Sequence, residues 1–132
     1  MTADNPATAP AVLVVDDEAD LLGTYERILH RIGYAVITAG TRAAGLAALE
    51  AASVGLVVAD VRLPDGDGLD LVRAARDSRL SVPAIVVTGY ASKAGRRDAL
   101  AAGAAAYLAK PFSISQLIAT VESVLGRGNH RQ

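Results

Sequence analysis

The stretch Val12-Leu13-Val14-Val15-Asp16-Asp17-Glu18 decides the fold class, because an unbroken apolar run ends there in a cluster of acids. Short apolar runs without polar alternation are typical of strands buried on both faces, as in a parallel sheet. Parallel strands share one carboxyl edge, where open α/β sheets usually bind ligands, so we expect the end residues of such runs to meet there. Three more apolar runs end in the same way: Leu56–Ala59 before Asp60, Ala84–Val87 before Thr88, and Ala106–Ala109 before Lys110.

The composition favours a single globular domain. The chain has 132 residues, of which 52% are hydrophobic and 20% are charged, and a chain of this length can bury an independent core. It has no cysteine, which excludes disulfides and removes the commonest structural zinc ligands. The net charge of −1 gives no basic excess for nucleic-acid binding. We see neither a secretory signal nor an apolar run near the ~20 residues that cross a bilayer, so we expect a cytoplasmic protein without membrane contact.

Strand-like and helix-like segments alternate five times between a flexible leader, residues 1–10, and a flexible tail, residues 126–132. This alternation predicts parallel strands, right-handed crossovers and helices on both faces. The helix near residues 92–102 is the weakest, because Gly95 lowers helix propensity, whereas Ser113 and Gln116 match a capping box. The expected strands are residues 11–15, 35–38, 55–59, 84–87 and 105–108, and the expected helices lie near 21–32, 41–52, 69–75, 92–102 and 113–125. Residues 64–68 are expected to form a loop.

The acids at this edge predict a metal-assisted phosphoryl acceptor. Carboxylates of Asp16, Asp17 and Asp60 would repel one another, and a hard cation such as Mg²⁺ would compensate, since it binds carboxylates together with phosphate oxygens. Lys110 adds positive charge. Aspartate is a known nucleophile that forms acyl-phosphates, and phosphoryl transfer depends on positioning and charge neutralisation more than on proton chemistry.

Taken together, the motifs resemble the receiver domain of bacterial two-component response regulators. The resemblance covers residues 11–125 and implies a flavodoxin-like (βα)5 doubly wound parallel sheet with strand order 2-1-3-4-5, an order known from flavodoxin and the chemotaxis receiver. Each motif is weak alone, but their order along the chain is specific. They are Asp16-Asp17, Asp60 followed by Leu63-Pro64 and Asp67-Gly68, Val87-Thr88-Gly89, and Tyr107 ahead of Lys110-Pro111-Phe112.

The resemblance implies a role for each acid at the site. Asp60 aligns with the phosphorylated aspartate of receivers. Asp17 aligns with the acid that binds Mg²⁺ directly, and Asp16 with a neighbour that often acts through a bound water. Arg62 would give its backbone carbonyl to the metal.

The resemblance also implies a conformational switch. Thr88 resembles the hydroxyl that hydrogen-bonds the phosphoryl group, and Lys110 resembles the lysine that pairs with it. The Lys110–Pro111 bond is expected to be cis, as it usually is in receivers. Tyr107 resembles the aromatic residue that turns inward when Thr88 moves, so that the surface from the fourth strand to the fifth helix shifts between two arrangements.

The function implied is that of a signal-transduction phosphoprotein rather than a conventional turnover enzyme. Asp60 would accept a phosphoryl group from a sensor histidine kinase, a histidine phosphotransfer protein or acetyl phosphate. The switched surface would then bind a protein partner, as a monomer or as a phosphorylation-dependent homodimer. With no output domain after residue 132, we expect either a stand-alone receiver, including a phosphorelay intermediate, or a piece of a longer regulator. We further hypothesise that Arg62 and Tyr90, each two residues past a site residue, hinder the hydrolytic water and prolong the phosphorylated state.

Alternatives remain at this point. The protein could be an interaction module that never turns over phosphate, or a phosphatase of haloacid-dehalogenase type, although those enzymes typically carry an acid where this chain has Arg62. Individually, Asp16 and Asp17 could be acids at a helix N-terminus, Thr88 a turn hydroxyl, Lys110 a solvated lysine and Tyr107 a core aromatic. Asp65 has no assigned role.

Overall fold

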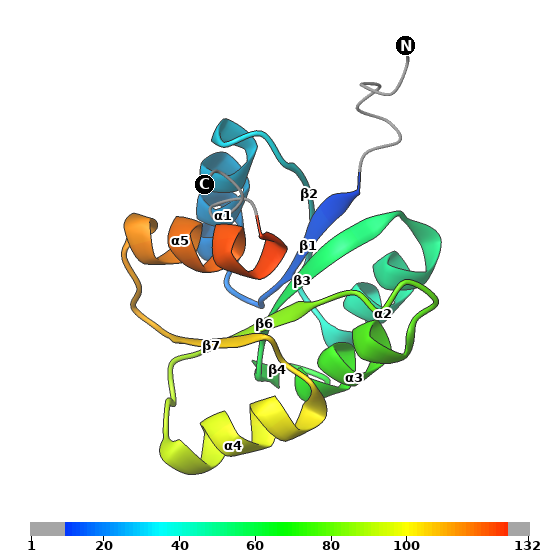
Figure 1. The fold of residues 1–132 in the computed structure, drawn as a ribbon, viewed down its shortest axis with the longest axis vertical. Helices are drawn as coiled ribbons and strands as arrows, with labels where there is room; N and C mark the ends of the chain where they lie inside the picture. Colours follow the sequence, from blue (N-terminus) through cyan, green and yellow to red (C-terminus); the bar gives the residue numbers. More distant parts are fainter. Residues whose placement is uncertain (1–9, 127–132) are drawn as a thin grey trace.

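The computed structural model describes residues 10–126, which form a parallel sheet between two layers of helices (Figure 1). Helices α1 (Ala19–Arg31) and α5 (Ile114–Leu125) cover one face and contact each other. Helices α2 (Arg42–Ala51), α3 (Leu69–Asp77) and α4 (Lys93–Ala102) cover the other face, where α3 contacts both of its neighbours. The predicted α/β class and the five helices are confirmed.

The main sheet has five parallel strands in the order β2-β1-β3-β6-β7. Counted along the chain without the short hairpin described below, this is the predicted flavodoxin-like order 2-1-3-4-5. The strands are β1 (Ala11–Val15), β2 (Ala35–Ala39), β3 (Val54–Asp60), β6 (Ala84–Thr88) and β7 (Ala106–Ala109).

The helices begin and end at the residues that local chemistry favours. The Thr41 and Ser92 side chains accept backbone N–H bonds at the starts of α2 and α4. Ser113 and Gln116 form the predicted capping box of α5. At the ends of α4 and α5, Gly103 and Gly126 adopt the left-handed conformation, which glycine reaches at little cost.

The segment after Asp60 differs from the predicted loop. Two residue pairs, β4 (Arg62–Leu63) and β5 (Gly66–Asp67), form a small antiparallel hairpin. Gly66 has a φ of 152°, a value that side chains disfavour, so glycine lets the chain reverse there. Two-residue strands are too short to show a period of alternating hydrophobicity, which is why the sequence pattern does not reveal them.

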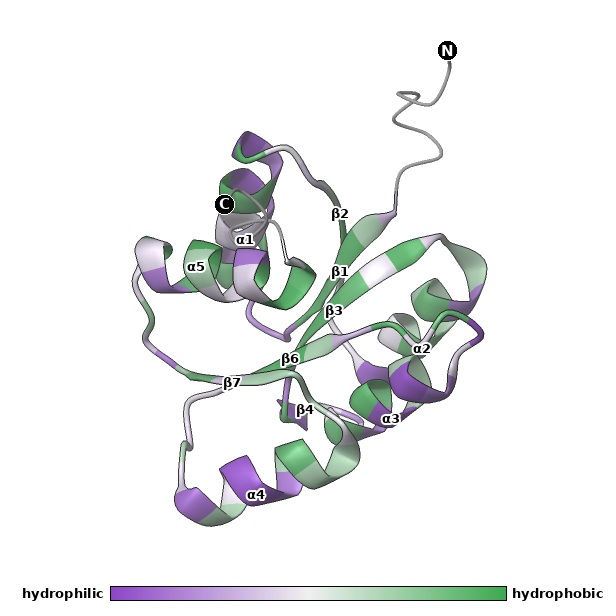
Figure 2. Cartoon of the chain, in the orientation of Figure 1, coloured by the Kyte–Doolittle hydropathy of each residue, from purple (hydrophilic) through white to green (hydrophobic). Residues whose placement is uncertain are grey.

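The sheet separates two apolar clusters. Leu29, Ile85 and Leu117 are among the buried residues between the sheet and the α1/α5 layer. Leu71 and Val86 belong to the cluster under α2, α3 and α4. The hydropathy colouring shows the same arrangement, with hydrophobic strands in the centre and mixed helices outside (Figure 2).

The predicted leader and tail fall mostly on residues 1–9 and 127–132, which lie outside the described residues. Between residues 10 and 126, no helix is both long and apolar enough to span a bilayer.

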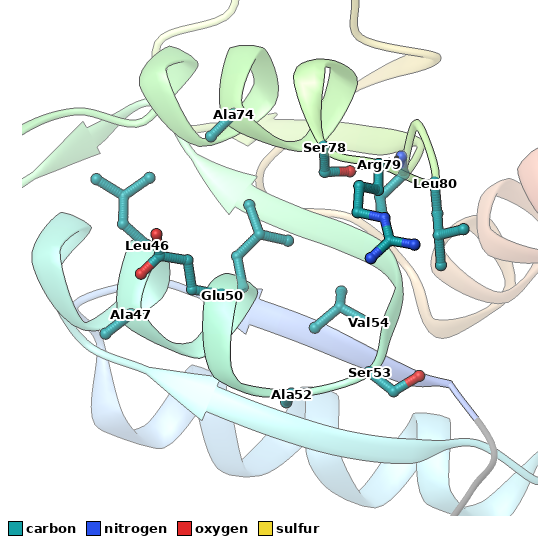
Figure 3. Close-up of a pocket in the computed structure, with 12 residues that line it drawn as sticks. Leu46, Ala47, Glu50, Ala52, Ser53, Val54, Ala74, Ser78, Arg79 and Leu80 are labelled. Carbon is teal, nitrogen blue, oxygen red and sulfur yellow. Dashed lines mark hydrogen bonds between the residues drawn. The ribbon is translucent and has the colours of Figure 1, made fainter.

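A hollow of about 1010 Å³ lies between the C-terminal halves of α2 and α3, away from the carboxyl edge of the sheet (Figure 3). Leu46 and Leu80 are among its lining residues, together with the charged side chains of Glu50 and Arg79. None of the predicted site residues lines it.

Candidate functional site

The carboxyl edge of the sheet brings the predicted site residues together. Asp16 directly follows β1, Asp60 ends β3, Thr88 ends β6 and Lys110 directly follows β7. Parallel pairing aligns these ends, since Asp60 pairs with Val87 and Thr88 with Ala109. Asp16, Asp60 and Thr88 are 1%, 8% and 3% exposed, so three polar groups are buried where a strand-end turn would ordinarily be solvated.

Lys110 lies at the centre of this edge. Its Nζ atom is 2.8 Å from Asp16 Oδ2, 2.9 Å from Asp60 Oδ2 and 3.1 Å from Glu18 Oε1. Burial would lower the pKa of the ammonium, but the hydrogen bonds and charges of Asp16 and Asp60 outweigh it and raise this pKa above its ordinary value. The backbone N–H of Lys110 donates to the Thr88 carbonyl at 2.8 Å, which fixes the lysine against β6.

The acids exceed the charge that one lysine supplies. Oxygen atoms of Asp16, Asp17 and Asp60 all lie within 4.8 Å of one another, with Asp17 exposed and the other two buried. Desolvation raises the pKa of Asp16, even though the nearby Lys110 ammonium and the Glu18 backbone N–H, which Asp16 Oδ1 accepts, act in the opposite direction. Oδ2 of Asp16 has no well-aligned hydrogen bond despite its ion pair. Three carboxylates with an under-satisfied oxygen form the kind of donor set that a hard divalent cation takes.

The hairpin after Asp60 packs its backbone closely against the end of β3, which carries this residue. The backbone N–H of Gly68 donates to the Val61 carbonyl at 2.7 Å, which returns the chain onto the end of β3. A Cβ atom at residue 68 would overlap the Asp60 carbonyl oxygen, so only glycine fits. Asp60 Oδ1 accepts the Arg62 backbone N–H at 3.3 Å, which helps to orient the carboxylate.

Arg62 and Tyr90 bring the segment after Asp60 into contact with the turn after Thr88. The Arg62 guanidinium lies 3.7 Å from the centroid of the Tyr90 ring, a cation–π contact. Thr88 Oγ1 accepts the Tyr90 backbone N–H at 3.0 Å, so the threonine hydroxyl and the turn that carries Tyr90 are linked.

Tyr107 lies in β7, and Pro111 follows Lys110 just after the end of that strand. Tyr107 is half-buried, and its hydroxyl accepts the Ser92 backbone N–H at 3.3 Å, at the start of α4. The Lys110–Pro111 peptide bond is cis, as expected.

Two acids that the sequence interpretation left without a role make specific contacts. Glu18 forms an ion pair with Lys110. Its position directly after Asp16-Asp17 is the sequence feature that could have indicated this contact. Asp65 accepts the backbone N–H groups of Arg42 and Ala43 at 2.7 and 2.9 Å and thereby joins the hairpin to the start of α2. No local pattern reveals this contact, because the partners are more than twenty positions apart.

Comparison with known proteins identifies the family. The model of the response regulator receiver domain matches residues 12–122. The transcriptional regulatory protein PrrA of Mycobacterium tuberculosis is 38% identical over 124 residues, which cover 94% of this chain and 53% of that protein. The photosynthetic apparatus regulatory protein RegA of Rhodovulum sulfidophilum is 36% identical over 114 residues, covering 86% of this chain and 62% of that protein. The chain therefore spans about half the length of the curated relatives that it matches.

Solved structures agree. A CheY-like receiver domain protein from Methanospirillum hungatei has a TM-score of 0.83 and 34% identity, covering 92% of this chain and 98% of that one. A response regulator from Burkholderia pseudomallei, solved with a phosphorylated aspartic acid, a calcium ion and citrate, has a TM-score of 0.78 and 31% identity, covering 92% of this chain and 74% of that one. Because the family model matches residues 12–122 and the fold agrees with that of solved receivers, the chain belongs to the response regulator receiver domain family of two-component systems, whose members act as phosphoacceptors.

Proposed function

We propose that Asp60 is the phosphoacceptor of this receiver. The observation that carries the proposal is the position of its carboxylate, which is buried at the carboxyl edge, held 2.9 Å from Lys110 Nζ and adjacent to two further acids. The Burkholderia relative, which was solved with a phosphorylated aspartic acid and a calcium ion, supports the same chemistry here.

In the transfer step, a carboxylate oxygen of Asp60 forms a bond to phosphorus. The bond from phosphorus to a histidine nitrogen of the donor breaks, and that nitrogen keeps the electron pair; with acetyl phosphate the leaving group is acetate. Lys110 stabilises the negative charge that gathers on the phosphoryl oxygens. Its elevated pKa keeps it cationic throughout the physiological range.

The residues present fit a Mg²⁺ ion. Asp17 and Asp60 would bind it directly, Asp16 directly or through a water, and the Arg62 backbone carbonyl would complete the protein ligands. The ion would neutralise the acids and the incoming phosphoryl group. Since Lys110 already faces three carboxylates, the remaining negative charge is what the cation would offset.

We further propose that Thr88 and Tyr107 carry the switch. The hydroxyl of Thr88 would donate to a phosphoryl oxygen, which moves the turn that contains Tyr90, because the Tyr90 N–H is bonded to that hydroxyl. The surface formed by α4, β7 and α5 would change with Tyr107 and bind a protein partner, or a second copy of the chain. The donor would be a sensor histidine kinase or a phosphotransfer protein, and the place of action the cytoplasm.

The Arg62–Tyr90 pair would limit dephosphorylation. Its two residues each stand two positions past a site residue and contact each other, and the pair would hinder the water that attacks the acyl-phosphate. The protein would then act as a signalling switch and not as a conventional turnover enzyme.

Intact-mass measurement after incubation with Mg²⁺ and acetyl phosphate tests the assignment. We expect a gain of one phosphoryl group in the wild type and none in Asp60→Asn, which keeps the shape of the side chain. Asp65→Asn is the matched control, since that acid lies in the same loop but contacts α2, and it should still be phosphorylated. An unmodified wild type would instead favour an interaction module, and sustained hydrolysis of a generic phosphate ester would favour a phosphatase.

A further inference from the structure

Gly95 occupies the first turn of α4, where glycine is an unfavourable choice. It lies three residues after the cap Ser92, inside a helix, and glycine is among the weakest helix formers. Its backbone does not require glycine either, because it is not among the residues with positive φ. The reason for a glycine here has to be found in what surrounds its Cα atom.

The space beside Gly95 is filled by the hydroxyl of Tyr107. A Cβ atom at residue 95 would lie 2.9 Å from Tyr107 Oη and 3.8 Å from Tyr107 Cζ. Real Cβ atoms essentially never approach a heavy atom within 3.0 Å, so the ring and a side chain at residue 95 cannot both keep these positions. A second approach, 3.1 Å to Ser92 Oγ, is tighter than nine in ten real Cβ contacts, but a shift of a few tenths of an ångström relieves it.

The same turn also holds the hydroxyl by a hydrogen bond. The Ser92 backbone N–H donates to Tyr107 Oη at 3.3 Å, while Ser92 Oγ accepts the Gly95 N–H at 2.9 Å. Tyr107 otherwise packs against the apolar cluster under α2, α3 and α4. The start of α4 thus gives the Tyr107 hydroxyl a hydrogen-bond donor, the Ser92 N–H, and a space beside Gly95 that no side chain fills.

We propose that Gly95 is a positioning residue that keeps the Tyr107 hydroxyl against the first turn of α4. A larger residue there displaces the ring, since a hydroxyl at the end of a rotatable side chain yields more easily than helix backbone. The position of Tyr107 and the placement of α4 are thereby coupled. Only the link from this coupling to signalling rests on the proposed switch role of Tyr107.

The test uses the whole chain with Gly95→Ala, Tyr107→Phe and the double substitution. The first readout is the Ser92 amide resonance in ¹H–¹⁵N spectra. Tyr107→Phe removes the acceptor of that amide and should shift its resonance; Gly95→Ala should shift it in the same direction. The double variant should match Tyr107→Phe alone, because the phenyl ring lacks the atom that blocks a Cβ at residue 95.

The second readout is the midpoint of thermal unfolding. Gly95→Ala should raise the midpoint more in the Tyr107→Phe background than in the wild type, because helix propensity then acts without the clash. Gly23→Ala in α1 is the matched control: its Cβ would meet only Arg27 Nη1, at 3.6 Å, so its effect should be the same in both backgrounds.

A wild-type Ser92 resonance in Gly95→Ala, or shifts and midpoints that simply add in the double variant, would overturn the proposal. Additive changes would mean that the Cβ acts on the Ser92 cap and not on Tyr107. Neither readout needs a phosphoryl donor, so the outcome is independent of whether Asp60 accepts phosphate.

Discussion

The guanidinium carbon of Arg62 lies 3.7 Å from the ring centroid of Tyr90, and this contact joins the loop after Asp60 to the loop after Thr88. Removing either partner should expose the acyl-phosphate to water. We expect Tyr90→Ala and Arg62→Ala to speed the loss of phosphate from Asp60 by roughly two- to fivefold, the equivalent of a cation–π contact at an exposed site. Decay of the isolated phosphorylated protein, followed by intact mass, measures this.

Tyr90→Phe is the control for that experiment, because it keeps the ring and loses only the hydroxyl. It should decay at the wild-type rate. Identical decay of wild type and both alanine variants would remove any shielding role for the pair.

The acid cluster should make stability depend on Mg²⁺. An ion that binds only the folded state stabilises it by about 2.7 kcal/mol at one hundred times its dissociation constant. We expect the midpoint of thermal unfolding to rise when Mg²⁺ is added and to fall back to its value without the ion when a chelator is added. Asp17→Asn should lose most of this rise, because Asp17 is one of the three clustered acids.

Asp20→Asn is the matched control for the metal, since Asp20 is an acid in the first turn of α1 outside that cluster. An equal Mg²⁺ response in Asp17→Asn and the wild type would place the ion elsewhere.

Gly68 should tolerate no side chain. A Cβ there would overlap the Asp60 carbonyl oxygen, so the hairpin must move away from β3. We expect Gly68→Ala to lower the free energy of unfolding by about 1–3 kcal/mol, the usual cost of overpacking, and to slow phosphorylation because the Asp60 loop shifts. Urea unfolding and the acetyl phosphate reaction measure the two effects. In contrast, Gly23→Ala should be neutral or stabilising, and a Gly68→Ala variant as stable as wild type would contradict the close approach.

Asp65 should make stability pH-dependent. Hydrogen bonds from the Ala43 and Arg42 backbone N–H groups lower the pKa of its carboxyl below the ordinary value. Because the folded pKa is the lower one, the stabilisation is present above the unfolded-state pKa and is lost as pH falls through the folded one. Asp65→Asn should therefore be less stable than wild type at neutral pH, and the difference should shrink in acid.

Urea unfolding at neutral pH and at a pH well below the ordinary aspartate pKa measures the Asp65 effect. Asp98→Asn, at an exposed acid on α4, controls for the loss of one surface charge. A stability gap that stays constant with pH would mean that Asp65 does not act through its charged form.

The sequence predicted the strands of the sheet and the residues at their carboxyl ends because both depend on short local patterns of apolar residues. Apolar runs gave the bounds of the five main strands within one residue of those observed, and the end of each run placed Asp60, Thr88 and Lys110 at one edge. The β4–β5 hairpin was not predicted because its two-residue strands are too short to show alternating hydrophobicity. The contacts of Asp65 with α2 and of Tyr107 with Gly95 were not predicted either. They depend on how separate elements pack, and a short stretch of sequence carries no information on that packing.

The sheet keeps its two apolar clusters on opposite sides. Substitutions on the outside of α1 and α5 can then accumulate with little effect on the helices of the other layer. The outer surfaces of the two layers are thus free to diverge separately, while the residues at the strand ends stay common to both.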